Sequence, residues 1–416
     1  MIADMARLLR RRPGFRRLWL GNLVSQLGDW VGWVAVAVVA LHEGGPLDIA
    51  LVFAAHHLPA AALTPISGVL ADRYDRRRVL IATSVGLGLL TVAMVGAAAL
   101  GSLALLQWLL AIRSALTAFF APAERAVLPR VVERDELMLA GAIDAGSWSV
   151  VFSLGMAAGG FLAALGPTLA LALDASTFVV AAWVWWGLPA VEPPSAPRRA
   201  GRESVHRELA QGWRVAMADP DLRRAVLAKA PFALAGGAGW LAIALRADAL
   251  LGAAIGFGVL HAIRGVGTGI GPALATKVLA RGGRRERVWQ LTYVVGLLGV
   301  VALGAASTVG LAVTAAFAWG VGGGANWVIS AERMATLGPD RFMARLGAID
   351  QVAMIAAMTF SVVALASWVE LGGNLGAGVL ALVGLAAVGW LALQRRSVAP
   401  RPNARASAAV VSAADC

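Results

Sequence analysis

Three charged residues stand in the middle of long apolar runs, where a charge is costly and indicates function. Asp29 lies about twelve residues into one run, hence about 18 Å deep at 1.5 Å per residue. Arg113 and Arg264 lie at similar depth in two other runs. A desolvated carboxylate can carry a proton near neutral pH, and an arginine at this depth needs a counter-charge. We therefore predict that Asp29 and Arg113 form a proton-coupling pair. A purely structural ion pair is the alternative.

A second group of residues could line a substrate cavity. Ser25 belongs to a small polar face of its run together with Gly21, Gly28 and Gly32, and we expect this face to point into the cavity. Arg264 has His261 one turn away, and this pair could recognise an anionic or polar group or could simply be packed against backbone carbonyls. The predicted cavity residues are Ser25, Gln26, Trp33, His56, His261 and Arg264.

No arrangement of residues suggests an enzyme. The sequence has no phosphate-binding loop of the Walker type, so ATP-driven chemistry is unsupported. No nucleophile has a credible base beside it, and no His, Asp or Glu cluster has metal-ligand spacing. The single cysteine, Cys416, excludes a disulfide framework. We expect no metal and no cofactor.

The composition indicates that the solvent of this chain is lipid. Its 416 residues are 59% hydrophobic and 14% charged, whereas a soluble domain has about 25% charged residues. The mean hydropathy is +0.74. A soluble fold of this length could not bury so much apolar side chain.

Apolar runs long enough to cross a bilayer as helices occur twelve times, in two sets of six. The first set covers 18–41, 47–71, 79–100, 103–121, 138–163 and 167–188. The second covers 222–245, 253–276, 288–306, 308–330, 346–369 and 375–393. The chain is thus predicted to be an all-α membrane protein of twelve transmembrane helices.

The basic residues give the orientation of these spans. With the N-terminus inside, the inner segments hold 32 of the 36 Lys and Arg residues, as the positive-inside rule requires. The net charge of +12 and the pI near 11.3 therefore reflect membrane topology and not nucleic-acid binding. We expect a multi-pass protein of the cytoplasmic (inner) membrane with both termini in the cytoplasm.

The polar break between the two sets predicts the domain boundaries. We expect an N-terminal six-helix bundle over 1–188, a cytoplasmic linker over 189–221, a C-terminal six-helix bundle over 222–394 and a disordered tail over 395–416. Within the linker, residues 203–217 have apolar side chains four apart, which favours either an amphipathic helix on the inner leaflet or a solvated linker helix.

The two sets are related by an internal repeat. Ala123-Glu124-Arg125 and Ala331-Glu332-Arg333 each follow the fourth span of a half, in the loop after it, and each precedes a Gly-Ala-Ile-Asp segment that ends at Asp144 or Asp350. The halves are therefore predicted to be parallel repeats around a central cavity. Neither Asp29 nor Arg113 has a copy in the second half, so the shared scaffold alone does not explain them.

The loop after the second span resembles the signature loop of the major facilitator superfamily. It reads Gly68-Val-Leu-Ala-Asp72-Arg73-Tyr-Asp75-Arg76-Arg77-Arg78, with aspartate at 75 where the pattern has glycine. The resemblance implies that Gly68, Asp72, Arg73, Arg76 and Arg77 form a cytoplasmic latch between the halves; alternatively, the arginines only set topology. We expect Asp144 and Asp350 to act in the same gate, bonded to Arg125, Arg333 or the signature loop.

Shorter segments resemble the drug/proton antiporter branch that contains macrolide-efflux proteins and the enterobactin exporter. They are residues 22–29, 121–129 and 173–178. In span five, Gly155, Gly159 and Gly160 are similar to the antiporter motif, with Met156 where that motif has proline. These glycines are equally consistent with close helix packing.

The resemblance implies a secondary transporter, working as a monomer, that exports an amphipathic drug-like compound by proton antiport with alternating access. The partners expected are the lipid bilayer, protons and the small-molecule substrate, with no nucleic acid. Three alternatives stay open: a siderophore or endogenous metabolite exporter, a non-transporting sensor or assembly protein on the same fold, and a nutrient importer.

Overall fold

The computed structural model describes residues 2–71, 74–190 and 205–394, and every regular element in these ranges is a helix. The first half contains α1 (Ile2–Arg11), α2 (Pro13–Glu43), α3 (Pro46–Ala71), α4 (Arg76–Ala99), α5 (Leu103–Thr117), α6 (Phe120–Val131), α7 (Leu137–Leu165) and α8 (Pro167–Trp186). The second half contains α9 (Val205–Ala218), α10 (Pro220–Leu227), α11 (Lys229–Leu251), α12 (Ala253–Ala280), α13 (Arg285–Gly304), α14 (Val309–Leu337), the 3₁₀ turn η1 (Asp340–Phe342), α15 (Met343–Glu370) and α16 (Leu375–Gln394).

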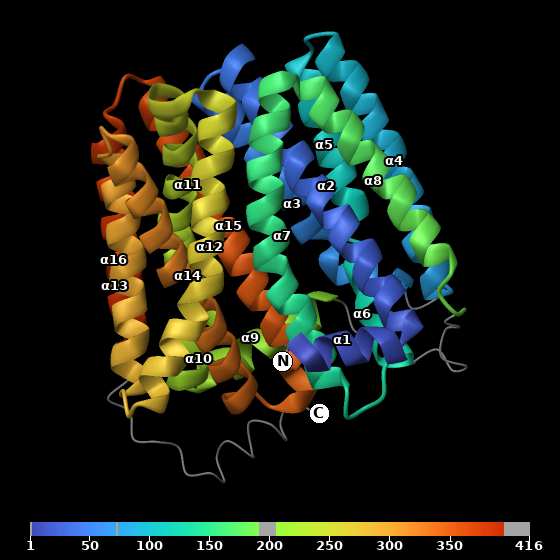
Figure 1. The fold of residues 1–416 in the computed structure, drawn as a ribbon. Helices are drawn as coiled ribbons and strands as arrows, with labels where there is room; N and C mark the ends of the chain where they lie inside the picture. Colours follow the sequence, from blue (N-terminus) through green and yellow to red (C-terminus); the bar gives the residue numbers. More distant parts are fainter. Residues whose placement is uncertain (1, 72–73, 191–204, 395–416) are drawn as a thin grey trace.

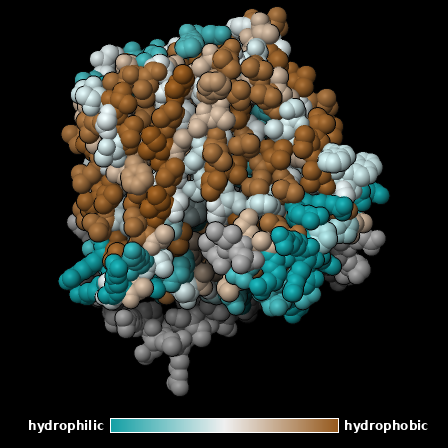
Figure 2. All heavy atoms as spheres, viewed as in Figure 1, coloured by the Kyte–Doolittle hydropathy of each residue, from teal (hydrophilic) through white to brown (hydrophobic). Residues whose placement is uncertain are grey.

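Eleven of the described helices are long and apolar enough to cross a membrane. The expected tenth span, α14, is not among these eleven. It packs against α12 and α13, and its apolar run contains the glycine-rich stretch 320–324 and Asn326. With α14 included, a helix stands at each of the twelve predicted positions. Brown apolar side chains cover the flank of the molecule in Figure 2, as a surface in contact with lipid requires.

The helices form two bundles side by side, α2–α8 and α10–α16 (Figure 1). Within the first bundle, α2 packs against α7 and α8; within the second, α11 packs against α12 and α15. The bundles meet mainly where α7 contacts α12 and where α3 contacts α15. Helices α1, α9 and α10 lie at one end of the molecule, called here the α10 end (Figure 1). The opposite end is called the far end.

Two predicted spans are each divided in two by proline. Pro122 lacks an N–H group and its ring crowds the carbonyl four residues earlier, and the helix breaks at Ala118 and Phe119 between α5 and α6. In the second half, Pro231 follows a break at Ala228 between α10 and α11. The hydroxyl of Tyr293 donates to the carbonyl of Ala228, which satisfies one backbone acceptor at this break.

Two expected loops are helical, which corrects the sequence analysis. Glu124 and Arg125 lie in α6, and Glu332 and Arg333 lie in α14. Both helices continue beyond their apolar runs, because a helix keeps its own hydrogen bonds whether lipid or the polar interface surrounds it. Hydropathy marks the end of the apolar run and not the end of the helix.

Helix α9 of the linker docks on the second bundle. It buries Gly212, Val215 and Ala216 against α10 and α15, and Arg345 donates to the side chain of Gln211 at 2.7 Å. The side chain of Trp213, on the apolar face predicted from the sequence, is half exposed. The second bundle begins at Pro220, two residues before the expected boundary. The predicted tail, 395–416, lies outside the described residues.

Candidate functional site

A cluster of three charged side chains lies in the middle of the first bundle. Arg113 of α5 donates through Nη2 to Asp29 of α2, and the same nitrogen lies 3.1 Å from Oδ2 of Asp174 of α8. Asp29 stands midway along α2. The guanidinium carbon of Arg113 is also 5.3 Å from the ring centroid of Phe178. The predicted pair of Asp29 and Arg113 is therefore in contact, with a second carboxylate on the same cation.

The members of this cluster differ in exposure. The side chain of Asp174 is 0% exposed and that of Arg113 is 4% exposed, whereas the side chain of Asp29 is 38% exposed. Helix α2 itself is one of the more buried spans. Asp29 is therefore the more exposed of the two carboxylates in the cluster.

Glycines of α2 allow α8 to pack closely against it. A Cβ atom at Gly28 would lie 2.0 Å from the hydroxyl of Thr177, and one at Gly21 would overlap the ring of Trp185. The small face of α2 thus packs against α8, because small residues let two backbones approach closely. The expectation that this face lines the cavity is wrong, and Ser25 on it is buried at 5% exposure.

Two histidines of α3 lie beside this cluster. The ring of His56 is 4.5 Å from that of Trp33, and the ring of His57 is stacked on Phe53 at 4.2 Å. The hydroxyl of Ser114, next to Arg113, donates to the carbonyl of His56 at 2.6 Å. These contacts tie α3 to the helix that carries Arg113. Gln26, three residues before Asp29, is half-buried.

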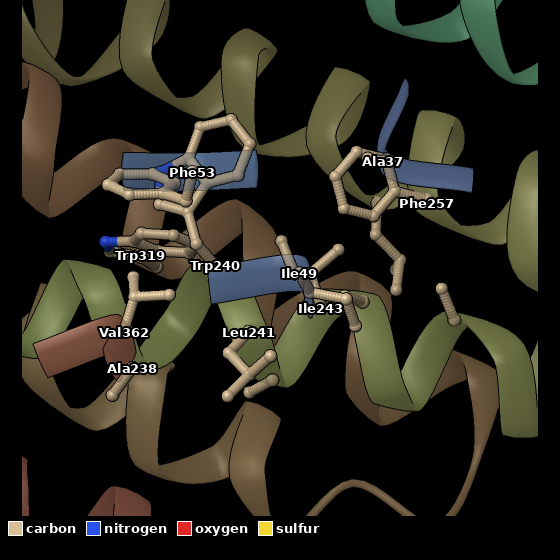
Figure 3. Close-up of a cluster of buried hydrophobic side chains, with 14 of the residues drawn as sticks. Ala37, Ile49, Phe53, Ala238, Trp240, Leu241, Ile243, Phe257, Trp319 and Val362 are labelled. Carbon is tan, nitrogen blue, oxygen red and sulfur yellow. The ribbon is translucent and has the colours of Figure 1, made fainter. Parts of the chain in front are cut away.

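A small apolar cavity lies where the two bundles meet, towards the far end. Its walls come from α2, α3, α11, α12 and α15, and include Trp33, Phe53, Trp240, Phe257 and Val362. Figure 3 shows Phe53, Ile49 and Ala37 of the first bundle facing Trp240, Phe257 and Val362 of the second. Trp33, one of the predicted cavity residues, lines this small cavity, and its contact with substrate stays a prediction.

Arg264 and His261 of α12 both lie against the ring of Trp240. His261 is 0% exposed and its ring is 3.9 Å from that of Trp240. It is thus a packed side chain, which corrects the prediction that it lines the substrate cavity. Arg264 lies among the rings of Phe152, Trp240 and Trp319.

The predicted latch is described only in part. Gly68 lies in α3, while Asp72 and Arg73 lie outside the described residues. Arg77 donates to the carbonyl of Trp186 at the end of α8, in its own bundle. Arg76 is buried and donates to the carbonyl of Tyr74 at 3.2 Å. These two hydrogen bonds lie within the first bundle, and a latch between the halves stays a prediction.

The two repeated aspartates have different partners. Asp350 accepts from Nζ of Lys229 at 2.5 Å, and that ammonium also lies 4.2 Å from the ring centroid of Trp327. The described partner of Asp350 is therefore Lys229 and not Arg333, while residues 72–73 of the signature loop, the other expected partner, lie outside the described residues. Asp144 lies near Asn22, which donates to Glu124, and a bond from Asp144 to Arg125 stays a prediction. Both aspartates lie towards the α10 end of their helices.

The three glycines of α7 face two different helices. A Cβ atom at Gly155 would lie 2.7 Å from Cβ of Trp30, and one at Gly159 would lie 3.0 Å from the backbone of Val31, both on α2. A Cβ atom at Gly160 would instead lie 2.8 Å from the carbonyl oxygen of Ala254 on α12. Gly160 thus lies at the contact between the bundles. Further along this contact, Ser149 donates to the carbonyl of Gly265 at 2.8 Å.

With this arrangement described, the sequence can be compared with known families. Residues 6–410 match the family described as transmembrane secretion effector, one of the major facilitator families. This chain belongs to that family. It is a family of membrane transporters and not of enzymes. Within the described residues, no three His, Cys, Asp or Glu side chains come together as a metal site would need.

Curated relatives of this chain are MFS-type transporters. An uncharacterized MFS-type transporter of Bacillus subtilis, YfiS, is 29% identical over 187 residues, which is 44% of each chain. Another from Mycobacterium tuberculosis, Rv0037c, is 34% identical over 161 residues, 36% of each chain. The match thus spans less than half the length of these relatives.

Solved structures show the same fold at low sequence identity. A point mutant of the nucleoside transporter NupG superposes with a TM-score of 0.74 at 10% identity, covering 91% of this chain and 98% of that one. A bacterial homologue of the iron transporter ferroportin gives 0.68 at 18% identity, covering 92% and 98%. These likenesses show that the chain has the major facilitator fold.

Two members of the buried ion pairs were not identified as site residues from the sequence. Asp174 contacts Arg113, and Lys229 contacts Asp350. A usable signal existed, because charges within spans commonly pair with one another, so a cation and a carboxylate at similar depth can be matched.

Proposed function

We propose that this protein exports an amphipathic organic compound across the cytoplasmic membrane in exchange for protons, by alternating access to a site between the bundles. The observation that carries this proposal is Arg113 held between Asp29 and Asp174 at mid-depth of the first bundle. Family membership supports transport, and the family description as a secretion effector supports export.

Charge counting explains how this cluster could carry a proton. With both carboxylates ionised, two negative charges share one guanidinium and leave a net charge of −1. A net charge is costly inside the membrane, and one proton removes it. Asp29 is the member open to exchange, since 38% of its side chain is exposed and Asp174 is enclosed. Asp29 thus takes and releases the proton while Asp174 holds Arg113 in place.

The contacts between the bundles support alternating access. Towards the far end, Trp33 and Phe53 pack against Trp240 and close the space between the bundles. Gly160 and Gly258 bring α7 and α12 into backbone contact there. Small residues at such a contact let helices pivot without losing their packing. Opening this end while closing the α10 end would expose Asp29 to each side in turn.

The basic residues support an orientation of the chain in the membrane. Arginines gather in the segments at the α10 end, which the positive-inside rule assigns to the cytoplasm. The site needs helices from both bundles, and one chain supplies both, so a monomer is the proposed working unit. Proton entry through Asp29 then drives release at the far end.

The test uses purified protein in proteoliposomes with an imposed pH gradient. The probes are Hoechst 33342, N-phenyl-1-naphthylamine and N-acetyl-3-(2-naphthyl)alanine, with a catecholate siderophore for the alternative substrate. We expect at least one aromatic probe to accumulate, and nigericin to abolish its accumulation. Accumulation that survives nigericin would contradict proton coupling. Transport of the siderophore in place of the aromatic probes would favour siderophore export, and no transport of any probe would favour a sensor.

A further inference from the structure

Arg264 is enclosed by aromatic rings from three other helices. Its guanidinium carbon lies 4.8 Å from the ring centroid of Phe152 on α7 and 4.8 Å from that of Trp240 on α11. It lies 4.7 Å from the centroid of Trp319 on α14. We call Arg264 and these three rings the aromatic cage. Figure 3 shows Trp240 and Trp319 lying next to one another. Because Phe152 belongs to the first bundle and the others to the second, the cage lies between the bundles.

The cage lacks an acid. Among the described residues, no carboxylate lies within 4.0 Å of Arg264 and no hydrogen bond from its guanidinium is found, while its Nε is buried without a partner. Two other cations deep within the predicted spans are paired: Arg113 with two aspartates and Lys229 with Asp350. The aromatic faces stabilise the cation only partly, since they accept no hydrogen bond in its plane.

An anionic group would complete this site. A guanidinium presents a planar fork of donors that matches a carboxylate, sulfonate or phosphate. The flat rings around it provide apolar walls for the rest of such a molecule. Trp30, next to Asp29, is 4.7 Å from the ring of Phe152, so the cage adjoins the proton-coupling cluster. The ring of His261 packs against that of Trp240, with their centroids 3.9 Å apart.

We propose that the aromatic cage binds the anionic group of the transported compound, which makes the substrates amphipathic organic anions with a flat apolar body. This deepens the proposed function and rests on it. An anion beside Asp29 would favour proton binding there and not oppose it. The exchange of the substrate for a proton must therefore come from alternation of the bundles, because the anionic substrate and the proton do not compete as like charges would.

Matched probes separate the effect of the ligand's charge on binding from the effect of its shape. N-acetyl-3-(2-naphthyl)alanine carries a carboxylate, and its methyl ester has the same apolar body without the charge. Naphthylalanine methyl ester adds a cationic comparison. Binding of each is measured by isothermal titration calorimetry to the full chain in nanodiscs, with empty nanodiscs subtracted. We expect the wild-type protein to bind the acid at least ten-fold more tightly than either ester.

Three variants assign this preference to the cage. Arg264→Gln should remove the difference between acid and ester, and Arg264→Lys should keep part of it. Arg246→Gln is the matched control, because Arg246 is an arginine of the second bundle that donates to the carbonyl of Gly304 instead. It should leave the preference unchanged. Unchanged ester binding shows that each variant remains folded.

The proposal is overturned by three results: equal affinity of acid and ester in the wild-type protein, no binding of the acid, or an Arg264→Gln variant that keeps the preference. None of these measurements uses a pH gradient. A failure of proton coupling alone would leave the acid preference intact, so the two proposals fail separately.

Discussion

Gly32 of α2 and Asp174 of α8 are in such close contact that a Cβ atom at position 32 would lie 2.2 Å from Oδ2 of the aspartate. The same oxygen lies 3.1 Å from Nη2 of Arg113. The absence of a side chain at position 32 thus allows the carboxylate to reach the guanidinium. A backbone position on one helix determines the geometry of a charge cluster that three helices share.

Replacing Gly32 with alanine should therefore displace Asp174 and weaken its bond to Arg113. Overpacking of this kind costs about 1–3 kcal/mol, so thermal unfolding in detergent should occur at lower temperature. Gly146→Ala is the control, because a Cβ atom on that helical glycine meets nothing within 4 Å. An equal melting temperature for the two variants would show that Asp174 has room to move.

The contact between the bundles should be equally sensitive at Gly258. A Cβ atom there would lie 2.5 Å from the carbonyl oxygen of Met156 and 2.7 Å from Cα of Gly160, both backbone atoms that cannot turn aside. Gly258→Ala should therefore separate α7 from α12 at the far end.

Cross-linking measures this separation in a chain whose Cys416 is replaced by serine. Gly45 lies close to the carboxylate of Glu370 at the far end, so cysteines at these two positions report closure. We expect Gly258→Ala to lower the cross-linking yield several-fold, while Gly384→Ala, whose Cβ atom meets nothing within 4 Å, leaves it unchanged. A full yield in Gly258→Ala would mean that the bundles close without this contact.

The pair of Lys229 and Asp350 should show the cost of an unpaired buried charge. Their side chains are 8% and 7% exposed, and breaking such a pair from one side typically costs about 3–5 kcal/mol. Lys229→Met should therefore destabilise the protein strongly. The double variant Lys229→Met with Asp350→Leu should recover most of the loss, because no charge stays uncompensated. Additive losses in denaturant unfolding would show that the pair is not coupled.

The orientation of the chain can be tested with single cysteines in the Cys416→Ser background. Asp135, before α7, is exposed near the α10 end, and Leu371, after α15, is 89% exposed at the far end. We expect a membrane-impermeant maleimide added to intact cells to label Leu371→Cys only. Labelling of Asp135→Cys from outside would reverse the proposed topology.

The long-range features of this fold could be predicted because lipid imposes them on the sequence. Apolar run lengths gave the positions of the helices, and charge within those runs gave Asp29 and Arg113 as a pair. The faces of the helices could not be predicted as well. Gly28 and Gly32 are as suitable for lining a cavity as for packing, and only the position of α8 decides that they face Asp174. The same holds for Asp350, whose partner Lys229 lies on a helix 121 residues away in the chain.

The central claim, that Asp29 carries the coupled proton, is tested most directly by comparing two transport modes of Asp29→Asn in proteoliposomes. Counterflow, the exchange of labelled for unlabelled probe without a gradient, needs only substrate movement, whereas accumulation driven by a pH gradient also needs the proton. We predict that Asp29→Asn keeps counterflow within about two-fold of wild type and loses gradient-driven accumulation by at least about ten-fold. Asp135→Asn, an exposed carboxylate outside the spans, should keep both. Gradient-driven accumulation at the wild-type rate in Asp29→Asn would contradict the account.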